Sequence, residues 1–269
     1  MSRKIAFFDI DGTLTSEIDG SVPEDAASAI REARSNGHLM FINTGRCMQN
    51  VEERFRNVGF DGYVCGCGTN IYCTKDNKLQ EILHVSQNHS IVAEILAEAR
   101  KYPLDILFES KYGVRFDIVQ PLISEGGIRQ YNAFVKRNYD MSHDPDSEDF
   151  TCDKFVVWFQ RLEDIPAFRL VSDKYFECID RGGNFREFVP LGFSKATGIQ
   201  AVLDYYGLTL DDAYALGDSN NDLSMLSYVK NSIAMGNSSP ESLFSKVSFV
   251  TLRSSEGGIR HALEHFHFL

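Results

Sequence analysis

Short apolar runs alternate with helical patterns over the first 65 residues. The runs at 5–8, 39–42 and 63–65 are continuously apolar and stop at polar residues, which is typical of parallel strands buried on both faces. Between them, Pro23 and two acids open a helical pattern with apolar residues at 26, 27, 30 and 33, and a second helix is expected at 48–57. This order predicts a doubly wound α/β sheet.

The pattern changes between residues 85 and 187. It predicts helices at 90–101, 123–136 and 164–172, and paired strands at 104–109, 113–119, 155–159, 175–179 and 185–189. Hairpin-like pairs mixed with helices indicate an antiparallel α+β module. After Pro190 the first pattern returns, with helices at 195–206, 222–226 and 259–265 and strands at 213–216 and 232–235. We therefore expect a discontinuous core, 1–84 with 188–269, that carries an inserted cap, 85–187.

Composition and charge narrow the class of protein. The chain has 269 residues, 43% of them hydrophobic, with 38 acidic against 27 basic residues and a formal net charge of −11. This charge disfavours nucleic acid and anionic membrane as partners, and no apolar run is long enough to span a bilayer. Six cysteines lack the paired spacing of a zinc site, so we expect reduced thiols and a cytoplasmic protein. The sequence does not indicate an oligomeric state.

Polar residues suited to metal or phosphate binding follow three of the predicted core strands. They are Asp9 and Asp11, Thr44 to Arg46, and Asp218 to Asp222. Since ligands bind beyond the carboxyl ends of parallel strands, we expect these side chains to converge. Three converging acids would repel one another unless a cation lay among them, and an all-oxygen ligand set favours Mg²⁺. A metal would also let an acidic protein bind an anionic substrate.

The same residues carry a resemblance to a known family. The chain resembles the haloacid dehalogenase superfamily, and specifically its Cof-type phosphatases with a type IIB cap. The matching motifs lie mainly in the core, and they are Asp9-Ile10-Asp11-Gly12-Thr13, Asn43-Thr44-Gly45-Arg46, Lys195, Gly217-Asp218-Ser219-Asn220-Asn221-Asp222, Ala234-Met235-Gly236-Asn237 and Glu256-Gly257-Gly258-Ile259. The cap is matched mainly by its place of insertion.

The resemblance implies a mechanism of phosphoryl transfer. Asp9 would be the nucleophile that forms an aspartyl-phosphate, and Asp11 would be the general acid and base, which requires a raised pKa. Thr44, with backbone groups at Gly45 and Arg46, would bind the phosphoryl oxygens. Lys195 and Asn221 complete the implied phosphate contacts. The implied Mg²⁺ ligands are Asp9, Asp11 through its backbone carbonyl, Asp218 and Asp222.

Some roles stay open on the sequence alone. Arg46 fits a substrate contact and an ion pair at a helix start equally well, and Asn221 and Asp222 also fit helix capping. The family often has Asn-Gly-Ala where this chain has Cys67-Gly68-Thr69, which leaves the choice of substrate open.

We expect a Mg²⁺-dependent phosphoric monoester hydrolase that acts on a small phosphorylated metabolite, with sugar phosphates the favoured class. A phosphosugar mutase of the same superfamily and a non-catalytic metabolite-binding regulator are the alternatives.

Overall fold

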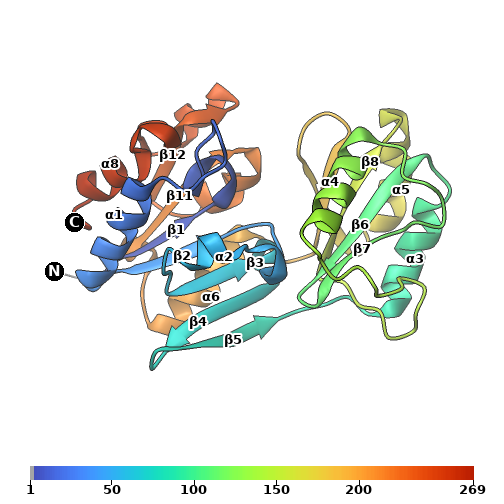
Figure 1. Ribbon diagram of the computed structural model, residues 1–269, viewed down its shortest axis with the longest axis horizontal. Coiled ribbons are helices and arrows are strands. Elements are labelled where there is room, and N and C mark those ends of the chain that lie inside the picture. Colours follow the sequence, from blue (N-terminus) through green and yellow to red (C-terminus); the bar gives the residue numbers. More distant parts are fainter. Residues whose placement is uncertain (1–2) are drawn as a thin grey trace. The chain divides into compact units, whose positions relative to one another are not determined.

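The computed structural model describes residues 3–269, which form two compact units (Figure 1). The core unit comprises the chain up to His84 together with Phe193–Leu269, and the cap unit comprises Val85–Gly192. Each unit has its own sheet and its own hydrophobic core.

The core unit is built on an eight-stranded sheet in the order β13-β12-β11-β1-β2-β3-β4-β5. The five strands from β12 to β3 run parallel, as the apolar runs predict, and β13 extends this parallel part. The strand bounds are β1 Ile5–Phe8, β2 Leu39–Asn43, β3 Gly62–Cys65, β4 Asn70–Lys75, β5 Lys78–His84, β11 Ala213–Ser219, β12 Asn231–Ser239 and β13 Phe249–Val250.

An antiparallel hairpin, β4–β5, extends the sheet at one edge, where the apolar pattern of the sequence predicts no strand. Its turn places Asp76 and Asn77 at φ angles of 50° and 58°, which suits a tight hairpin turn and these residue types. Strand β5 is exposed over its first four residues, so its sequence lacks the apolar run that identified the other strands.

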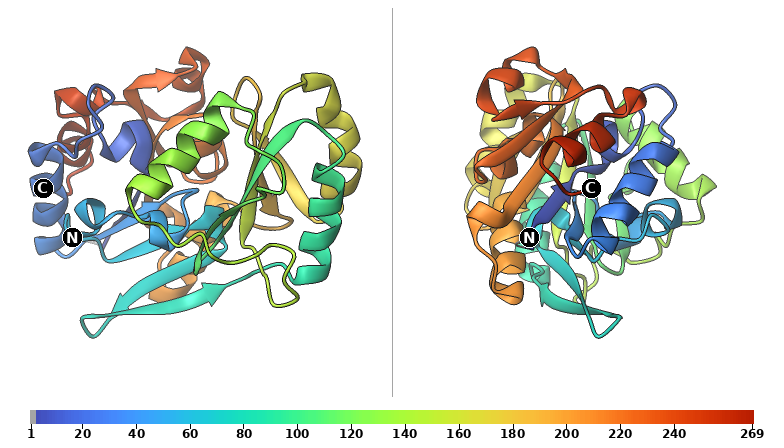
Figure 2. Two further views of the ribbon diagram at one scale, coloured as in Figure 1. Left: turned by 45° about the vertical axis from the view of Figure 1, so that its right-hand side comes forward. Right: turned by 90° about the vertical axis from the view of Figure 1, so that its left-hand side faces the viewer.

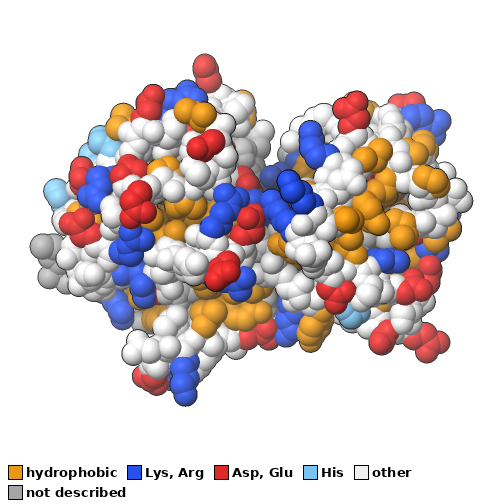
Figure 3. All heavy atoms as spheres, viewed as in Figure 1, with side chains coloured by type: hydrophobic (Ala, Val, Ile, Leu, Met, Phe, Trp, Pro, Cys, Tyr) orange, Lys and Arg blue, Asp and Glu red, His pale blue; other side chains and the backbone are white. Residues whose placement is uncertain are grey.

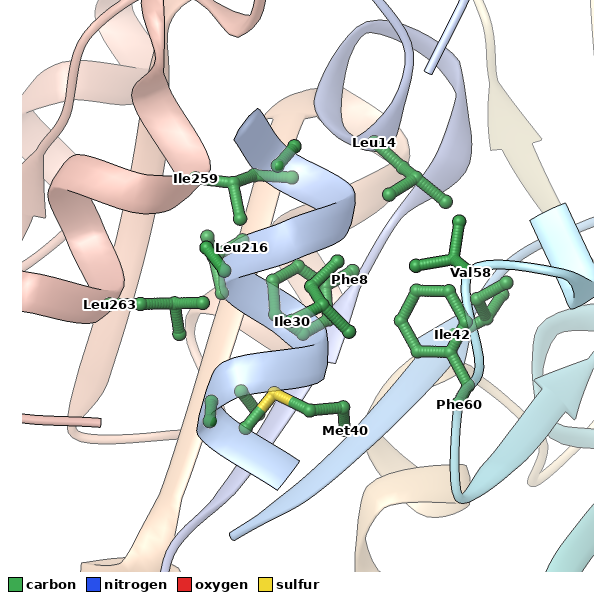
Figure 4. Packing of buried hydrophobic residues seen from close by; sticks show 14 of the residues in the cluster. Phe8, Leu14, Ile30, Met40, Ile42, Val58, Phe60, Leu216, Ile259 and Leu263 are labelled. Carbon is green, nitrogen blue, oxygen red and sulfur yellow. The ribbon is translucent and has the colours of Figure 1, made fainter. Parts of the chain in front are cut away.

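Helices cover both faces of the core sheet, as the right-hand view of Figure 2 shows. On one face lie α1 (Glu24–Ser35), α2 (Glu53–Arg56) and α8 (Gly258–His265), and on the other lie α6 (Lys195–Tyr206) and α7 (Leu223–Leu226). Figure 4 shows the first face, where Phe8, Ile42 and Leu216 of the strands pack against Ile30 of α1 and Leu263 of α8. Burial of both faces explains why the central strands are continuously apolar.

The helix expected at 48–57 is wrong over its first half. Only Glu53–Arg56 is α-helical, and Met48–Asn50 form a separate short 3₁₀ turn. The backbone carbonyl of Asn50 accepts a hydrogen bond of 3.2 Å from the side chain of Arg46, through Nη1. The chain between the 3₁₀ turn and α2 is therefore held by a side chain and not by a continuous helix.

The cap unit is α+β, as predicted, with a five-stranded antiparallel sheet in the order β7-β6-β8-β10-β9. Helices α3 and α5 pack on one face, and aromatic side chains of α4 and β7 meet on the other. The bounds are α3 His89–Ala99, β6 Leu104–Ser110, β7 Gly113–Phe116, α4 Glu125–Lys136, β8 Lys154–Phe159, α5 Ile165–Ser172, β9 Phe176–Asp180 and β10 Phe185–Pro190.

The boundary at which the chain passes from the cap back to the core lies later than residue 188, the position that the sequence suggested. Residues 188–190 complete β10 and pair with β9, so the cap unit continues to Gly192. On the face seen in Figure 3, acidic and basic side chains are interspersed. Within residues 3–269, no helix has the length and apolar character that crossing a membrane requires.

Candidate active site

The site lies where three adjacent parallel strands end. In the core sheet β1 lies between β11 and β2, so their carboxyl ends share one edge. Asp9 follows β1 directly, Thr44 follows β2, and Asp218 lies near the end of β11. The convergence expected from the sequence is therefore present within the core unit.

A tight turn follows Asp9 and carries Asp11 and Gly12. Asp11 has φ −77° and ψ 112°, and Gly12 has φ 81° and ψ −4°, which together make a type II turn from Ile10 to Thr13. A Cβ atom on Gly12 would lie 2.4 Å from Asp218 Oδ2. Glycine is thus required both by the positive φ and by the close approach of this carboxylate.

Three carboxylates form a group on this edge of the sheet. One oxygen each of Asp9, Asp218 and Asp222 lies within 4.8 Å of the others. Asp222 is fully buried, and its Oδ2 accepts hydrogen bonds from the backbone N–H groups of Asp218 and Ser219, at 2.9 and 3.1 Å. Asp222 therefore caps the turn at Ser219 and also belongs to the carboxylate group.

The pKa of two of these carboxyl groups is raised, chiefly by burial, to about 6 for Asp9 and to about 8 for Asp218. Negative neighbours, including Asp222, contribute to the rise of both pKa values, while Lys195 opposes it. A divalent cation among the three would relieve this repulsion, and carboxylate oxygens are the donors that a hard cation prefers. The donor set therefore fits a metal held by Asp9, Asp218 and Asp222.

Lys195 is buried beside the carboxylate group. Its Nζ lies 2.5 Å from Asp9 Oδ1 and 2.6 Å from Asp222 Oδ1, and its side chain is 1% exposed. Burial opposes its charge, but Asp222 and Asp9 outweigh burial and raise the pKa of Lys195. The lysine therefore stays charged and offsets part of the buried negative charge.

The backbone around Lys195 is held from two sides. Ser194 caps α6 by accepting a hydrogen bond from the N–H of Thr197. Asn43 Nδ2 donates a hydrogen bond of 3.0 Å to the carbonyl of Lys195. At Gly68, a Cβ atom would lie 2.4 Å from the carbonyl oxygen of Ser194, and φ is 95°. Gly68 thus lets this loop approach the start of the helix closely.

Asp11 lies outside the group of three carboxylates. Its side chain is 67% exposed and pairs with Arg46, with Nη2 2.6 Å from Oδ1 and Nε 3.1 Å from Oδ2. Arg46 also contacts Glu52 at 3.3 Å. Arg46 therefore forms ion pairs, one of the two roles that the sequence left open, and its contact with substrate stays a prediction.

Thr44 and Asn221 lie on loops of the same edge. Thr44 is buried, and its Oγ1 accepts a hydrogen bond of 3.2 Å from the N–H of Arg46, across Gly45. Asn221 accepts a hydrogen bond through Oδ1 from the hydroxyl of Ser219. Both side chains are held by their own loops.

Two residues near the turn form contacts that the sequence did not indicate. Thr13 Oγ1 donates to Asp218 Oδ1 at 3.2 Å, and Asn237 Nδ2 donates to the carbonyl of Gly12 at 2.7 Å. Thr13 and Asn237 lie in motifs that carried the resemblance, which was the only signal that could have indicated them.

The chain is similar to known proteins over most or all of its length. The model of the haloacid dehalogenase-like hydrolase family matches residues 6–263. YkrA of Bacillus subtilis (strain 168) is 28% identical over 275 residues, which cover all of both chains. A second protein of that strain, the 5-amino-6-(5-phospho-D-ribitylamino)uracil phosphatase YitU, is 26% identical over 252 residues, 85% of each chain.

Solved structures share the fold over the whole chain. BT1666 from Bacteroides thetaiotaomicron, a phosphatase of this superfamily, has a TM-score of 0.82 at 24% identity, covering 99% of this chain and 96% of its own. The subclass IIB sugar phosphatase BT4131 has a TM-score of 0.80 at 23% identity, covering 99% of this chain and 100% of its own. Because the family model spans nearly the entire sequence, the chain belongs to the haloacid dehalogenase-like hydrolase family, and within it to the Cof-type phosphatases.

Proposed function

We propose that the core unit hydrolyses small phosphomonoesters with Mg²⁺ through an aspartyl-phosphate on Asp9. The observation that carries this proposal is the position of Asp9, which is buried, contacts Lys195 at 2.5 Å and shares a carboxylate group with Asp218 and Asp222. When bound there, Mg²⁺ would offset the repulsion between these carboxylates and the phosphate.

Asp9 attacks phosphorus through the carboxylate oxygen that Lys195 does not hold. Lys195 contacts Oδ1, so Oδ2 is the oxygen with the fewer partners and the one assigned to attack. A bond forms from Oδ2 to phosphorus as the bond from phosphorus to the leaving oxygen breaks. The fixed charge of Lys195 orients Asp9 and stabilises negative charge as the phosphoryl group transfers.

Asp11 supplies a proton to the leaving alcohol. It later takes a proton from the water whose oxygen attacks phosphorus, and the bond from phosphorus to Asp9 Oδ2 breaks, which releases phosphate and restores the Asp9 carboxylate. Its exposed carboxyl group, on the turn that follows Asp9, suits a group that exchanges protons with substrate. The ion pair with Arg46 orients this side chain and must loosen when Asp11 is protonated, because a neutral carboxyl group attracts the guanidinium less strongly.

Small phosphorylated sugars and sugar-like metabolites are the proposed substrate class. Two relatives support it through their names, the ribitylaminouracil phosphatase YitU and the sugar phosphatase BT4131. We also propose that the cap unit, residues 85–192, determines which substrates are accepted. A cytoplasmic location stays a prediction from the sequence.

A phosphate-release screen tests the proposal. The purified chain is assayed against sugar phosphates, sugar alcohol phosphates and nucleotides, with Mg²⁺ and with EDTA, beside Asp9→Asn as the matched control. We expect Mg²⁺-dependent release that Asp9→Asn abolishes. Release that persists in Asp9→Asn would refute the nucleophile, release in EDTA would refute the metal, and an isomerised hexose phosphate without free phosphate would indicate a mutase.

A further inference from the structure

The turn that carries Asp11 is held by side chains at both backbone groups of Gly12. The N–H of Gly12 donates to Thr15 Oγ1 at 3.2 Å, and its carbonyl accepts from Asn237 Nδ2 at 2.7 Å. The other end of the same carboxamide, Asn237 Oδ1, accepts from the N–H of Ser254 at 2.8 Å. Asn237 thus bridges the turn to a segment far away in the sequence.

Asn237 is itself held in place by the backbone around it. It lies in β12, next to Gly236, whose N–H donates to the carbonyl of Leu252 at 3.0 Å. A Cβ atom on Gly236 would lie 2.9 Å from the backbone nitrogen of Arg253, so the two segments touch directly. The carboxamide therefore projects toward Gly12 from a fixed base.

The orientation of Gly12 affects the Asp218 carboxylate of the group and the Asp11 carbonyl, which the family resemblance implies as a metal ligand. The peptide group before it carries the carbonyl of Asp11, and the residue after it, Thr13, donates to Asp218 Oδ1. Asp218 Oδ2 also lies where a Cβ of Gly12 would be. A rotation of the turn would therefore displace both the Asp11 carbonyl and the Asp218 carboxylate.

We propose that Asn237 is a positioning residue of the metal site, acting through the Gly12 carbonyl on the Asp11 carbonyl and on Asp218. The inference rests on the metal site of the proposed function and adds a residue that touches neither metal nor substrate. Partners that orient metal ligands typically change metal affinity about 10- to 100-fold when they are removed.

Glu17 provides a matched control within the same contact. Its carboxylate accepts hydrogen bonds from Arg253 Nε at 2.7 Å, Ser254 Oγ at 2.6 Å and the N–H of Ser255 at 3.0 Å. It therefore binds the same 253–255 segment as Asn237, but from a position four residues beyond the turn. Glu17 has no hydrogen bond to the Ile10–Thr13 turn, so its replacement weakens the contact and leaves the hold on Gly12 in place.

Binding of Mn²⁺ to metal-free protein, measured by electron paramagnetic resonance without substrate, separates the two residues. We expect Asn237→Ala to raise the Mn²⁺ dissociation constant about 10-fold or more and Glu17→Gln to leave it at the wild-type value. Circular dichroism and thermal unfolding establish that each variant is folded. Asn237→Ser, which is too short to bridge both partners, should show the same loss and replaces Asn237→Ala if that variant does not fold.

Each alternative outcome has a defined meaning. Wild-type Mn²⁺ affinity in a folded Asn237→Ala or Asn237→Ser variant would overturn the proposal, as would an equal loss in Glu17→Gln. A wild-type protein that binds no Mn²⁺ would instead refute the metal site itself, and this inference with it.

Discussion

Each unit of this protein buries a lysine between two carboxylates. In the core unit, Lys195 Nζ lies 2.5 Å from Asp9 and 2.6 Å from Asp222. In the cap unit, Lys154 Nζ lies 3.0 Å from Glu109 and 2.8 Å from Glu187, with all three side chains less than one-tenth exposed. The two arrangements differ in what surrounds them.

The cap cluster is balanced and the core cluster is not. Arg181 lies 3.2 Å from Glu187, so the cap cluster of Glu109, Lys154, Arg181 and Glu187 sums to zero formal charge. The core cluster of Asp9, Lys195, Asp218 and Asp222 sums to a formal charge of −2. A balanced buried cluster needs no ligand, whereas a buried excess of negative charge is costly and supports the proposal that the core cluster is the active site.

The largest expected effect follows replacement of the core lysine. Lys195→Met leaves Asp9 and Asp222 buried without their cation, so the free energy of unfolding should fall by about 3–5 kcal/mol. Phosphate release should also fall by about 10²- to 10³-fold, because the charge beside Asp9 is lost. Urea unfolding and steady-state assays check the two effects. A stable variant with normal turnover would show that Lys195 is not part of the site.

The matched change in the cap unit should affect stability alone. Lys154→Met removes the buried cation that Glu109 and Glu187 share and leaves Arg181 beside Glu187, which should lower the free energy of unfolding by up to about 3–5 kcal/mol. Binding of Mn²⁺ to the folded variant should equal that of the wild type. Reduced Mn²⁺ affinity would mean that the two clusters do not differ in the way their charges suggest.

The sequence predicted one of these lysines and missed the other. Lys195 opens a helix within a motif that carries the family resemblance, so the sequence indicated that it belongs to the site, while its contact with phosphate stays a prediction. Lys154 opens β8, Lys-Phe-Val-Val-Trp-Phe, where a lysine at a strand end is ordinarily solvated. Its burial arises from Glu109 and Glu187, which lie 45 and 33 residues away and have no sequence pattern that links them to it.

A similar limit applies to the fold. The parallel core strands were predictable because burial on both faces makes them continuously apolar. The β4–β5 hairpin was not, since β5 is exposed over half its length and carries charged residues. The pairing of Asp11 with Arg46 was also open, because spacing cannot distinguish an ion pair from a substrate contact.

Adding a divalent cation should stabilise the fold by binding the core cluster, whereas the cap cluster should not contribute to this gain. At about 100 times its dissociation constant, Mg²⁺ should increase the free energy of unfolding by about 2.7 kcal/mol, because it binds the folded state only. Asp218→Asn should abolish most of this gain, while Lys154→Met should retain it. Thermal unfolding with and without Mg²⁺ measures the difference. Equal gains in Asp218→Asn and wild type would place the cation elsewhere.

The smallest expected effect follows replacement of Glu17, which tests whether charge balance or position in the core unit distinguishes the two clusters. Glu17 lies in the core unit, but the negative charge of its carboxylate is compensated, because it accepts hydrogen bonds from Arg253, Ser254 and Ser255. Partial burial opposes its charge, yet these hydrogen bonds lower the pKa of Glu17 from 4.5 to about 2. The carboxylate therefore stabilises the fold above about pH 4.5, and this contribution is lost as the pH falls through 2.

Glu17→Gln should accordingly lower the free energy of unfolding by about 1–2 kcal/mol at neutral pH. The difference from the wild type should shrink as the pH falls below about 4.5. There the unfolded wild-type chain takes up a proton on Glu17 while the folded chain does not, which favours unfolding of the wild type. Urea unfolding at a series of pH values measures this convergence. If Glu17→Gln changed phosphate release as strongly as Lys195→Met, location in the core rather than charge excess would explain the functional cluster. If it changes stability alone, a balanced core carboxylate behaves like the balanced cluster of the cap.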